Sequence, residues 1–127
     1  MNTKQIGNLG EDHAVRIYER NNFCIVLRNF FNHIGKQFGE IDFIAQRGHD
    51  LHFVEIKTRS SNAYGHALES ITFRKRFRLI KTARYFLANV FDSESLSVHF
   101  DLAVVRICPF DKHVETITIY SDVIEDI

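Results

Sequence analysis

The chain has 127 residues, of which 45% are hydrophobic and 25% are charged, with 12 Phe and a single Pro. This length and apolar content predict one globular domain over residues 1–127 and exclude a disordered chain. The formal net charge is zero, which by itself argues against a nucleic-acid partner.

No apolar run approaches the roughly 20 residues of a membrane span, and residues 1–10 lack the apolar segment of a signal peptide. Cys24 and Cys108 lie in expected strands without Cys-x-x-Cys spacing. They indicate buried, reduced thiols in a cytoplasmic protein with no membrane partner. The seven histidines are scattered without partners at zinc-ligand spacing, so we expect no zinc site.

The first predicted element is a helix over residues 7–21, where apolar positions recur with helical periodicity. Glu11 shares the helix face of Ala14, Val15 and Tyr18. Its carboxylate either points toward a functional site or stabilises the N-terminal end of the helix as a first-turn acid.

Strands follow the helix. The first strand is predicted over residues 23–27. It is followed by Arg28, Asn29 and a loop that ends at Gly35. Residues 39–59 are predicted to form two strands joined by the turn Arg47-Gly48-His49-Asp50.

This hairpin brings charged residues together on one face. If Gly48 and His49 form a two-residue loop, residues directly opposite one another project from the same face, with Cβ atoms about 4.5–5.5 Å apart. The resulting pairs are Asp42 with Glu55 and Glu40 with Lys57.

Apart from these charged residues, the second strand of the hairpin carries mostly apolar side chains on both of its faces. This pattern predicts a central strand that is covered on both sides. Like charges buried there need a cation, a proton or a basic partner. Asp42 and Glu55 therefore predict either a site for a hard cation or a structural ion pair in which Lys57 neutralises the carboxylates.

A loop is predicted over residues 58–70, directly after this site, where it could gate access. A helix is then predicted to start near Thr72, and the spacing indicates a buried stripe of Phe73, Phe77, Ile80 and Leu87. Its polar face is almost purely cationic, with the basic residues Arg74, Lys75, Arg76, Arg78, Lys81 and Arg84. Such a face is either an ordinary solvated surface or a track for the nucleic-acid backbone.

The remaining chain predicts a polar break over 92–95, an apolar strand over 98–107, a turn over 109–112 and an edge strand over 113–120. Asp101 interrupts the apolar strand as a buried structural acid or as a group behind the site. The order of elements predicts a mixed α/β sheet with helices on both faces, in which the basic helix connects two parallel strands.

Asp42, the hairpin and Glu55-Ile56-Lys57 resemble the PD-(D/E)XK motif of restriction-endonuclease-like nucleases, although Ile41 stands where that motif places Pro. Further motifs resemble the YraN-like family of predicted endonucleases over most of the chain, from Gly7 to about Val105. They are Gly7-Asn8-Leu9-Gly10-Glu11, Arg28-Asn29, Gly39-Glu40-Ile41-Asp42, Phe53-Val54-Glu55-Ile56-Lys57-Thr58-Arg59, Lys75 and Phe100-Asp101. The chain is also similar to archaeal Holliday-junction resolvases, in which an acid on the first helix joins the site, and this resemblance favours Glu11 as a site residue.

The resemblance implies a restriction-endonuclease-like fold and a nuclease that uses Mg²⁺ or Mn²⁺ and acts on DNA rather than RNA, with branched or damaged DNA as the expected substrate. We expect Asp42, Glu55, the Ile56 carbonyl and Glu11 to hold the metal, and Lys57 to orient the attacking hydroxide. Glu40 is expected to hold the Lys57 ammonium, and a homodimer is expected if the substrate is a two-fold-symmetric junction. The residues expected to bind the nucleic-acid backbone are Arg59, Lys75, Arg74 and Arg78.

Two alternatives stay open. One is a nucleic-acid-binding module that keeps the nuclease fold without catalysis, and the other is a structural protein with a buried charge network.

Overall fold

The computed structural model describes residues 3–31, 40–61, 72–89 and 96–124. Its elements follow the predicted order, and their bounds are α1 Thr3–Arg20, β1 Cys24–Phe31, β2 Glu40–Arg47, β3 Asp50–Ser60, α2 Phe73–Asn89, β4 Ser97–Ile107 and β5 Val114–Tyr120. The sheet has the strand order β1-β2-β3-β4-β5, so β1 and β5 form its edges. Only β3 and β4 pair in parallel, and the other neighbours are antiparallel.

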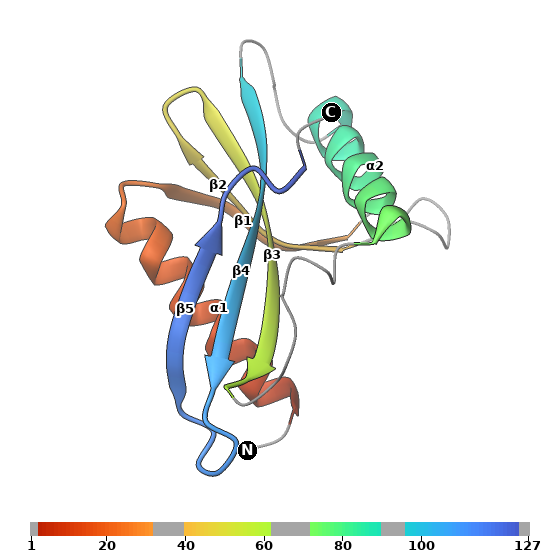
Figure 1. Cartoon of the computed structure of the whole chain (residues 1–127). Coiled ribbons are helices and arrows are strands. Elements are labelled where there is room, and N and C mark those ends of the chain that lie inside the picture. Colours follow the sequence, from red (N-terminus) through yellow and green to blue (C-terminus); the bar gives the residue numbers. More distant parts are fainter. Residues whose placement is uncertain (1–2, 32–39, 62–71, 90–95, 125–127) are drawn as a thin grey trace.

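Two helices flank this sheet, with α1 along one face and α2 against the other (Figure 1). Phe53 and Val54 of β3 show how the two faces alternate: Phe53 packs beneath Phe86 of α2, while Val54 packs beneath Ala14 of α1. The central strand is therefore covered on both sides, as predicted. The mixed α/β architecture is confirmed and is consistent with a restriction-endonuclease-like fold.

The predicted hairpin has the expected loop and register. Gly48 and His49 form the turn, and the pairing runs from Arg47 with Asp50 as far as Phe43 with Val54. Gly48 has a φ of 60°. Residues with a side chain rarely adopt this value, which tight hairpin turns require at their first central position. The register fixes which face of the sheet each charged side chain of β2 and β3 takes.

Three predicted boundaries were wrong. Helix α1 begins at Thr3 rather than at residue 7, so Glu11 lies well inside the helix and is not the first-turn acid that the sequence left open. The first strand does not end at residue 27 but continues through Arg28 and Asn29 to Phe31, past an irregularity between Ile25 and Leu27. The loop predicted from residue 58 begins later, because β3 continues beside β4 to Ser60. The rest of that loop, and the break predicted over 92–95, lie outside the described residues.

Helix α2 begins where predicted, but its buried stripe was predicted wrongly. Thr72 caps the helix, since its hydroxyl accepts a hydrogen bond from the Lys75 amide at 3.2 Å. Phe73 is 83% exposed and Phe77 is 53% exposed, while Ile80 and Leu87 are only partly buried. The residues that face the sheet are Leu79, Thr82, Ala83 and Phe86.

The spacing of that second stripe is equally helical, and Thr82 and Ala83 are small enough to let the helix approach the sheet closely. Helical periodicity alone could not choose between the two stripes. The result is that two aromatic side chains of α2 face away from the core.

The expectation of two buried cysteines was also wrong. Both thiols are free, but Cys24 is exposed and Cys108 is half-buried. Cys24 begins an edge strand, and Cys108 follows the last residue of β4 rather than lying within it. Among the described residues, neither helix is long and apolar enough to cross a membrane.

Candidate active site

The candidate site is a cleft that opens where the β2–β3 pairing ends. If the pairing continued past Phe43 and Val54, the Ile56 amide would face Ile41. Instead, this amide donates a hydrogen bond of 2.7 Å to Oδ2 of Asp42. The side chain thus replaces the backbone partner, and the two strands separate at the point where the carboxylates lie.

The cleft has a volume of about 420 Å³. Its lining comes from β2, β3 and α2 and consists of Glu40, Asp42, Glu55, Ile56, Lys75, Arg78 and Leu79. Asp42 and Glu55 therefore reach the same cleft, although they lie beyond the paired part of the hairpin.

The negative charges in this cleft are not fully compensated. Burial raises the pKa of Asp42 to about 7, and repulsion from Glu55, Glu40 and Glu11 acts in the same direction. The hydrogen bond from the Ile56 amide opposes this rise without cancelling it. Asp42 is therefore a carboxyl group that would gain from a nearby cation.

Glu55 already has a basic partner. The Lys75 ammonium, from the first turn of α2, lies 2.8 Å from Oε1 of Glu55. Lys57 lies close to the same pair, because the charge of Lys75 is the main cause that lowers the Lys57 pKa, with burial and the charge of Arg59 also contributing. Glu55 raises this pKa. Glu40 was predicted to be the partner of Lys57. In the structure, Lys57 instead lies in a cluster with Lys75 and Glu55.

Glu11, on α1, is not part of the lining of the cleft, although its charge acts on Asp42. A Cβ added at Gly10 would lie 3.3 Å from both methyl groups of Val105, so the missing side chain lets this part of α1 lie close to the sheet. The next residue, Glu11, is 7% exposed and lies 3.4 Å from Nε of Arg28. Its contribution to the raised pKa of Asp42 places its charge within electrostatic reach of the cleft.

The predicted nucleic-acid-binding residues are distributed around the same region. Lys75 and Arg78 line the cleft. Arg59 lies within electrostatic reach of Lys57, and Arg74 is exposed one residue before Lys75 on α2. The structure thus brings Lys75 and Arg78 into the lining of the cleft, while Arg59 and Arg74 lie outside that lining.

The raised pKa of Asp42 predicts that the free energy of unfolding depends on pH, and that Asp42→Asn removes this dependence. The proton binds with a pKa of about 7 in the folded protein, against an ordinary value of 3.8. Asp42 therefore stabilises the fold at low pH, and this contribution is lost as the pH rises through about 7. As the pH rises from about 5 to about 8 without divalent cations, we expect the free energy of unfolding of Asp42→Asn to increase by roughly 2–4 kcal/mol relative to that of the wild type. Urea unfolding in EDTA measures the difference, and parallel pH profiles for both proteins would contradict it.

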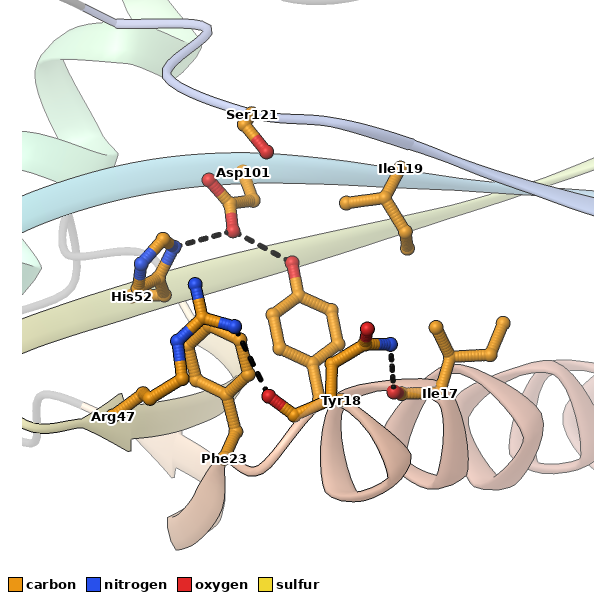
Figure 2. A pocket seen from close by; sticks show the side chains of 9 residues that line it. Ile17, Tyr18, Phe23, Arg47, His52, Asp101, Ile119 and Ser121 are labelled. Carbon is orange, nitrogen blue, oxygen red and sulfur yellow. Dashed lines mark hydrogen bonds and ion pairs between the residues drawn. The ribbon is translucent and has the colours of Figure 1, made fainter.

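A second buried polar group lies on the opposite, α1 side of the sheet (Figure 2). Asp101 is 2% exposed, and its Oδ2 accepts a hydrogen bond of 2.6 Å from the Tyr18 hydroxyl and lies 2.7 Å from Nδ1 of His52. Its Oδ1 accepts the Asp122 amide at 3.2 Å. Burial, and then the charge of Asp101, raises the pKa of Tyr18. These contacts favour the structural role that the sequence left open for Asp101.

This network lines a cavity of about 230 Å³. Phe23 and Arg47 also line it, with the Arg47 guanidinium 4.3 Å from the centroid of the Phe23 ring. Sequence reasoning did not identify His52 and Tyr18 as polar partners, because each lies in an apolar row of its element. The one available signal was Asp101 itself, since a buried acid needs donors.

Known proteins resemble the chain across this whole region. The model of the uncharacterised protein family UPF0102 matches residues 10–105. A UPF0102 protein of Dictyoglomus turgidum is 37% identical over 109 residues, which cover 86% of this chain and 88% of the relative. A UPF0102 protein of Vibrio cholerae is 36% identical over 107 residues, 84% of each chain, and one of Fusobacterium nucleatum is 38% identical over 87 residues, 68% of this chain and 70% of the relative. The match spans the hairpin, the cleft and most of β4, so the chain belongs to the YraN family, UPF0102.

Proposed function

We propose that this protein is a Mg²⁺- or Mn²⁺-dependent endonuclease that hydrolyses phosphodiester bonds in branched or damaged DNA. The observation that supports the proposal most is that Asp42 and Glu55 line one cleft beside the ammonium groups of Lys57 and Lys75. Carboxylates that bind a cation, next to basic groups that bind a phosphate, are the parts that metal-assisted phosphodiester hydrolysis requires.

The residues present fit a hard divalent cation. Asp42, Glu55 and Glu11 offer carboxylate oxygens and Ile56 offers a backbone carbonyl, which are the donor types that Mg²⁺ and Mn²⁺ prefer. The raised pKa of Asp42 supports this fit, because burial and then repulsion from Glu55 disfavour its charged form, and a bound cation would offset both effects. A bound ion would lower the pKa of a water molecule and polarise a phosphoryl oxygen.

The basic residues would act on the substrate. The Lys57 ammonium would orient the attacking water and offset the charge that develops on the phosphoryl oxygens in the transition state. Lys75 pairs with Glu55 at 2.8 Å, and it would turn to a phosphate when a divalent cation takes its place at that carboxylate. Arg59, next to Lys57, would bind a neighbouring phosphate.

The exposed face of α2 would bind the DNA beside the cleft. Arg74 and Arg78 are exposed cations near its N-terminal end, and Phe73 and Phe77 project on the same helix. Basic residues bind the phosphate backbone, while exposed aromatic rings can stack on bases that are unpaired. Branched and damaged DNA offers such bases, and a homodimer would suit a junction with two-fold symmetry.

The proposal is tested by cleavage of labelled DNA. The substrates are a four-way junction, a flap, a nicked duplex, a linear duplex and a single strand, each with Mg²⁺ or Mn²⁺. We expect cutting that requires the metal, prefers a branched substrate and falls by at least about 100-fold in Glu55→Ala. The matched control is Glu115→Ala, which removes an exposed carboxylate from edge strand β5. No cutting of any substrate by the folded wild-type protein would contradict the proposal.

The ion pair between Lys75 and Glu55 also favours a second function, a nucleic-acid-binding module without catalysis. In such a module the ammonium would keep its place at the carboxylate. DNA would then bind equally well in EDTA and in Mg²⁺. Asp42→Ala would bind DNA more tightly, since it removes a negative charge that faces the phosphates.

A further inference from the structure

The turn between β4 and β5 carries a group of metal-ligating side chains away from the cleft. β3 and β4 are parallel, with Ser60 beside Ile107, so this turn lies at the end of the sheet opposite the β2–β3 hairpin (Figure 1). It also lies beyond residues 10–105, the part that matches the family. Any site in this turn is therefore separate from the proposed nuclease site.

Backbone bonds hold the turn in a defined shape. The Cys108 amide donates to the His113 carbonyl at 2.9 Å, and the Lys112 amide donates to the Cys108 carbonyl at 3.0 Å. The Lys112 ammonium bonds the Pro109 carbonyl at 2.7 Å. These contacts fix the positions from which Cys108, Asp111 and His113 extend their side chains.

The three side chains converge. Cys108 Sγ, an Asp111 carboxylate oxygen and a ring nitrogen of His113 all lie within 4.8 Å of one another. Nδ1 of His113 already contacts Oδ1 of Asp111, and the His113 amide donates to the same oxygen at 3.2 Å. Tetrahedral Zn²⁺ has bonds of about 2.0–2.3 Å, which place its ligand atoms about 3.3–3.8 Å apart. Shifts of about 1 Å would therefore bring these atoms to ligand positions.

We propose that Cys108, Asp111 and His113 bind a borderline-soft divalent cation, with Zn²⁺ as the best match. Sulfur, imidazole nitrogen and carboxylate oxygen are the ligands that Zn²⁺ takes, whereas Mg²⁺ prefers oxygen alone. Three protein ligands leave a fourth position for water or another ligand. Asp111 and His113 are exposed and Cys108 is half-buried, so an ion can reach the site.

The spacing of the histidines did not predict this site, and the proposal opposes the expectation that the chain has no zinc site. The spacing Cys-x-x-Asp-x-His, read together with a tight turn, is the signal that was available. The carboxylate of Asp111 is the ligand that joins the thiol to the imidazole across the turn.

Cobalt binding to the full-length, reduced protein tests the proposal. Co²⁺ takes the same ligands as Zn²⁺, and a bound thiolate produces a near-ultraviolet charge-transfer band. In excess Mg²⁺, which would fill the proposed nuclease site, we expect one Co²⁺ per chain to produce this band, and Zn²⁺ to displace it. Cys108→Ser should lose the band, and His113→Gln, which changes an exposed side chain, should weaken Co²⁺ binding.

The chain provides matched controls. Cys24→Ser removes the other free thiol, which is exposed in β1, and it should keep the full band. Glu55→Ala should also keep it, which separates this site from the proposed nuclease site. Absence of the band in the folded wild type, or an unchanged band in Cys108→Ser, would overturn the proposal.

Discussion

Replacing Lys57 with alanine is expected to lower DNA cleavage by about 10²–10³-fold while DNA binding stays largely intact. The ammonium would act on the attacking water and on charge that exists only in the transition state, so its removal should lower the rate more than the affinity. Single-turnover cleavage of the preferred substrate measures the rate. Binding of the same labelled DNA with Ca²⁺ in place of Mg²⁺ measures the affinity.

The structure indicates that this variant will fold. Lys57 lies near Lys75 and Arg59, whose positive charges help to lower its pKa, so its removal relieves a repulsion. Arg16→Ala is the matched control, since it removes an exposed cation from α1, and we expect it to cleave like the wild type. Lys57→Arg keeps the charge but changes its shape and should restore only part of the rate. Equal cleavage by Lys57→Ala and the wild type would remove Lys57 from the mechanism.

The hairpin shows what the sequence can predict about the site. The turn residues Gly48 and His49 set the register, and strict alternation then assigns Asp42 and Glu55 to the same face. These are local rules, and the paired part of the hairpin follows them. The separation of the strands at Asp42 is different, because it depends on a bond between a side chain and the Ile56 amide. Backbone pairing rules do not include such a bond.

The orientation of α2 shows where sequence reasoning fails. The stripe with Phe73 and the stripe with Phe86 both have helical spacing, and only the shape of the sheet surface decides which one is buried. The error has a functional consequence, since it placed Phe73 and Phe77 in the core instead of on the surface beside the cleft. The convergence of Tyr18, His52 and Asp101 from three elements was equally beyond local patterns.

Asp101→Ala is expected to lower the free energy of unfolding by about 3–5 kcal/mol, which is the cost of removing one partner from a buried charged network. The Tyr18 hydroxyl and Nδ1 of His52 both contact Oδ2 of Asp101 in the interior. Without the carboxylate, these two buried polar groups lose their hydrogen-bond partner. Loss of the contact with the Asp122 amide adds a smaller cost. Urea unfolding at neutral pH measures the change.

Two further variants distinguish the stability that this network contributes from the effect of removing any carboxylate. Tyr18→Phe keeps the aromatic packing and removes one donor, so we expect a loss of only about 1–2 kcal/mol. Asp12→Ala removes a half-exposed carboxylate that pairs with Arg28 at 2.7 Å, and surface pairs of this kind contribute about 0–1 kcal/mol. In the double variant Tyr18→Phe with Asp101→Ala, the loss in the free energy of unfolding should be smaller than the sum of the two single losses, because both substitutions remove the same hydrogen bond. If Asp101→Ala cost no more than Asp12→Ala, the network would not stabilise the fold, and Asp101 would need another explanation for its place beneath α1.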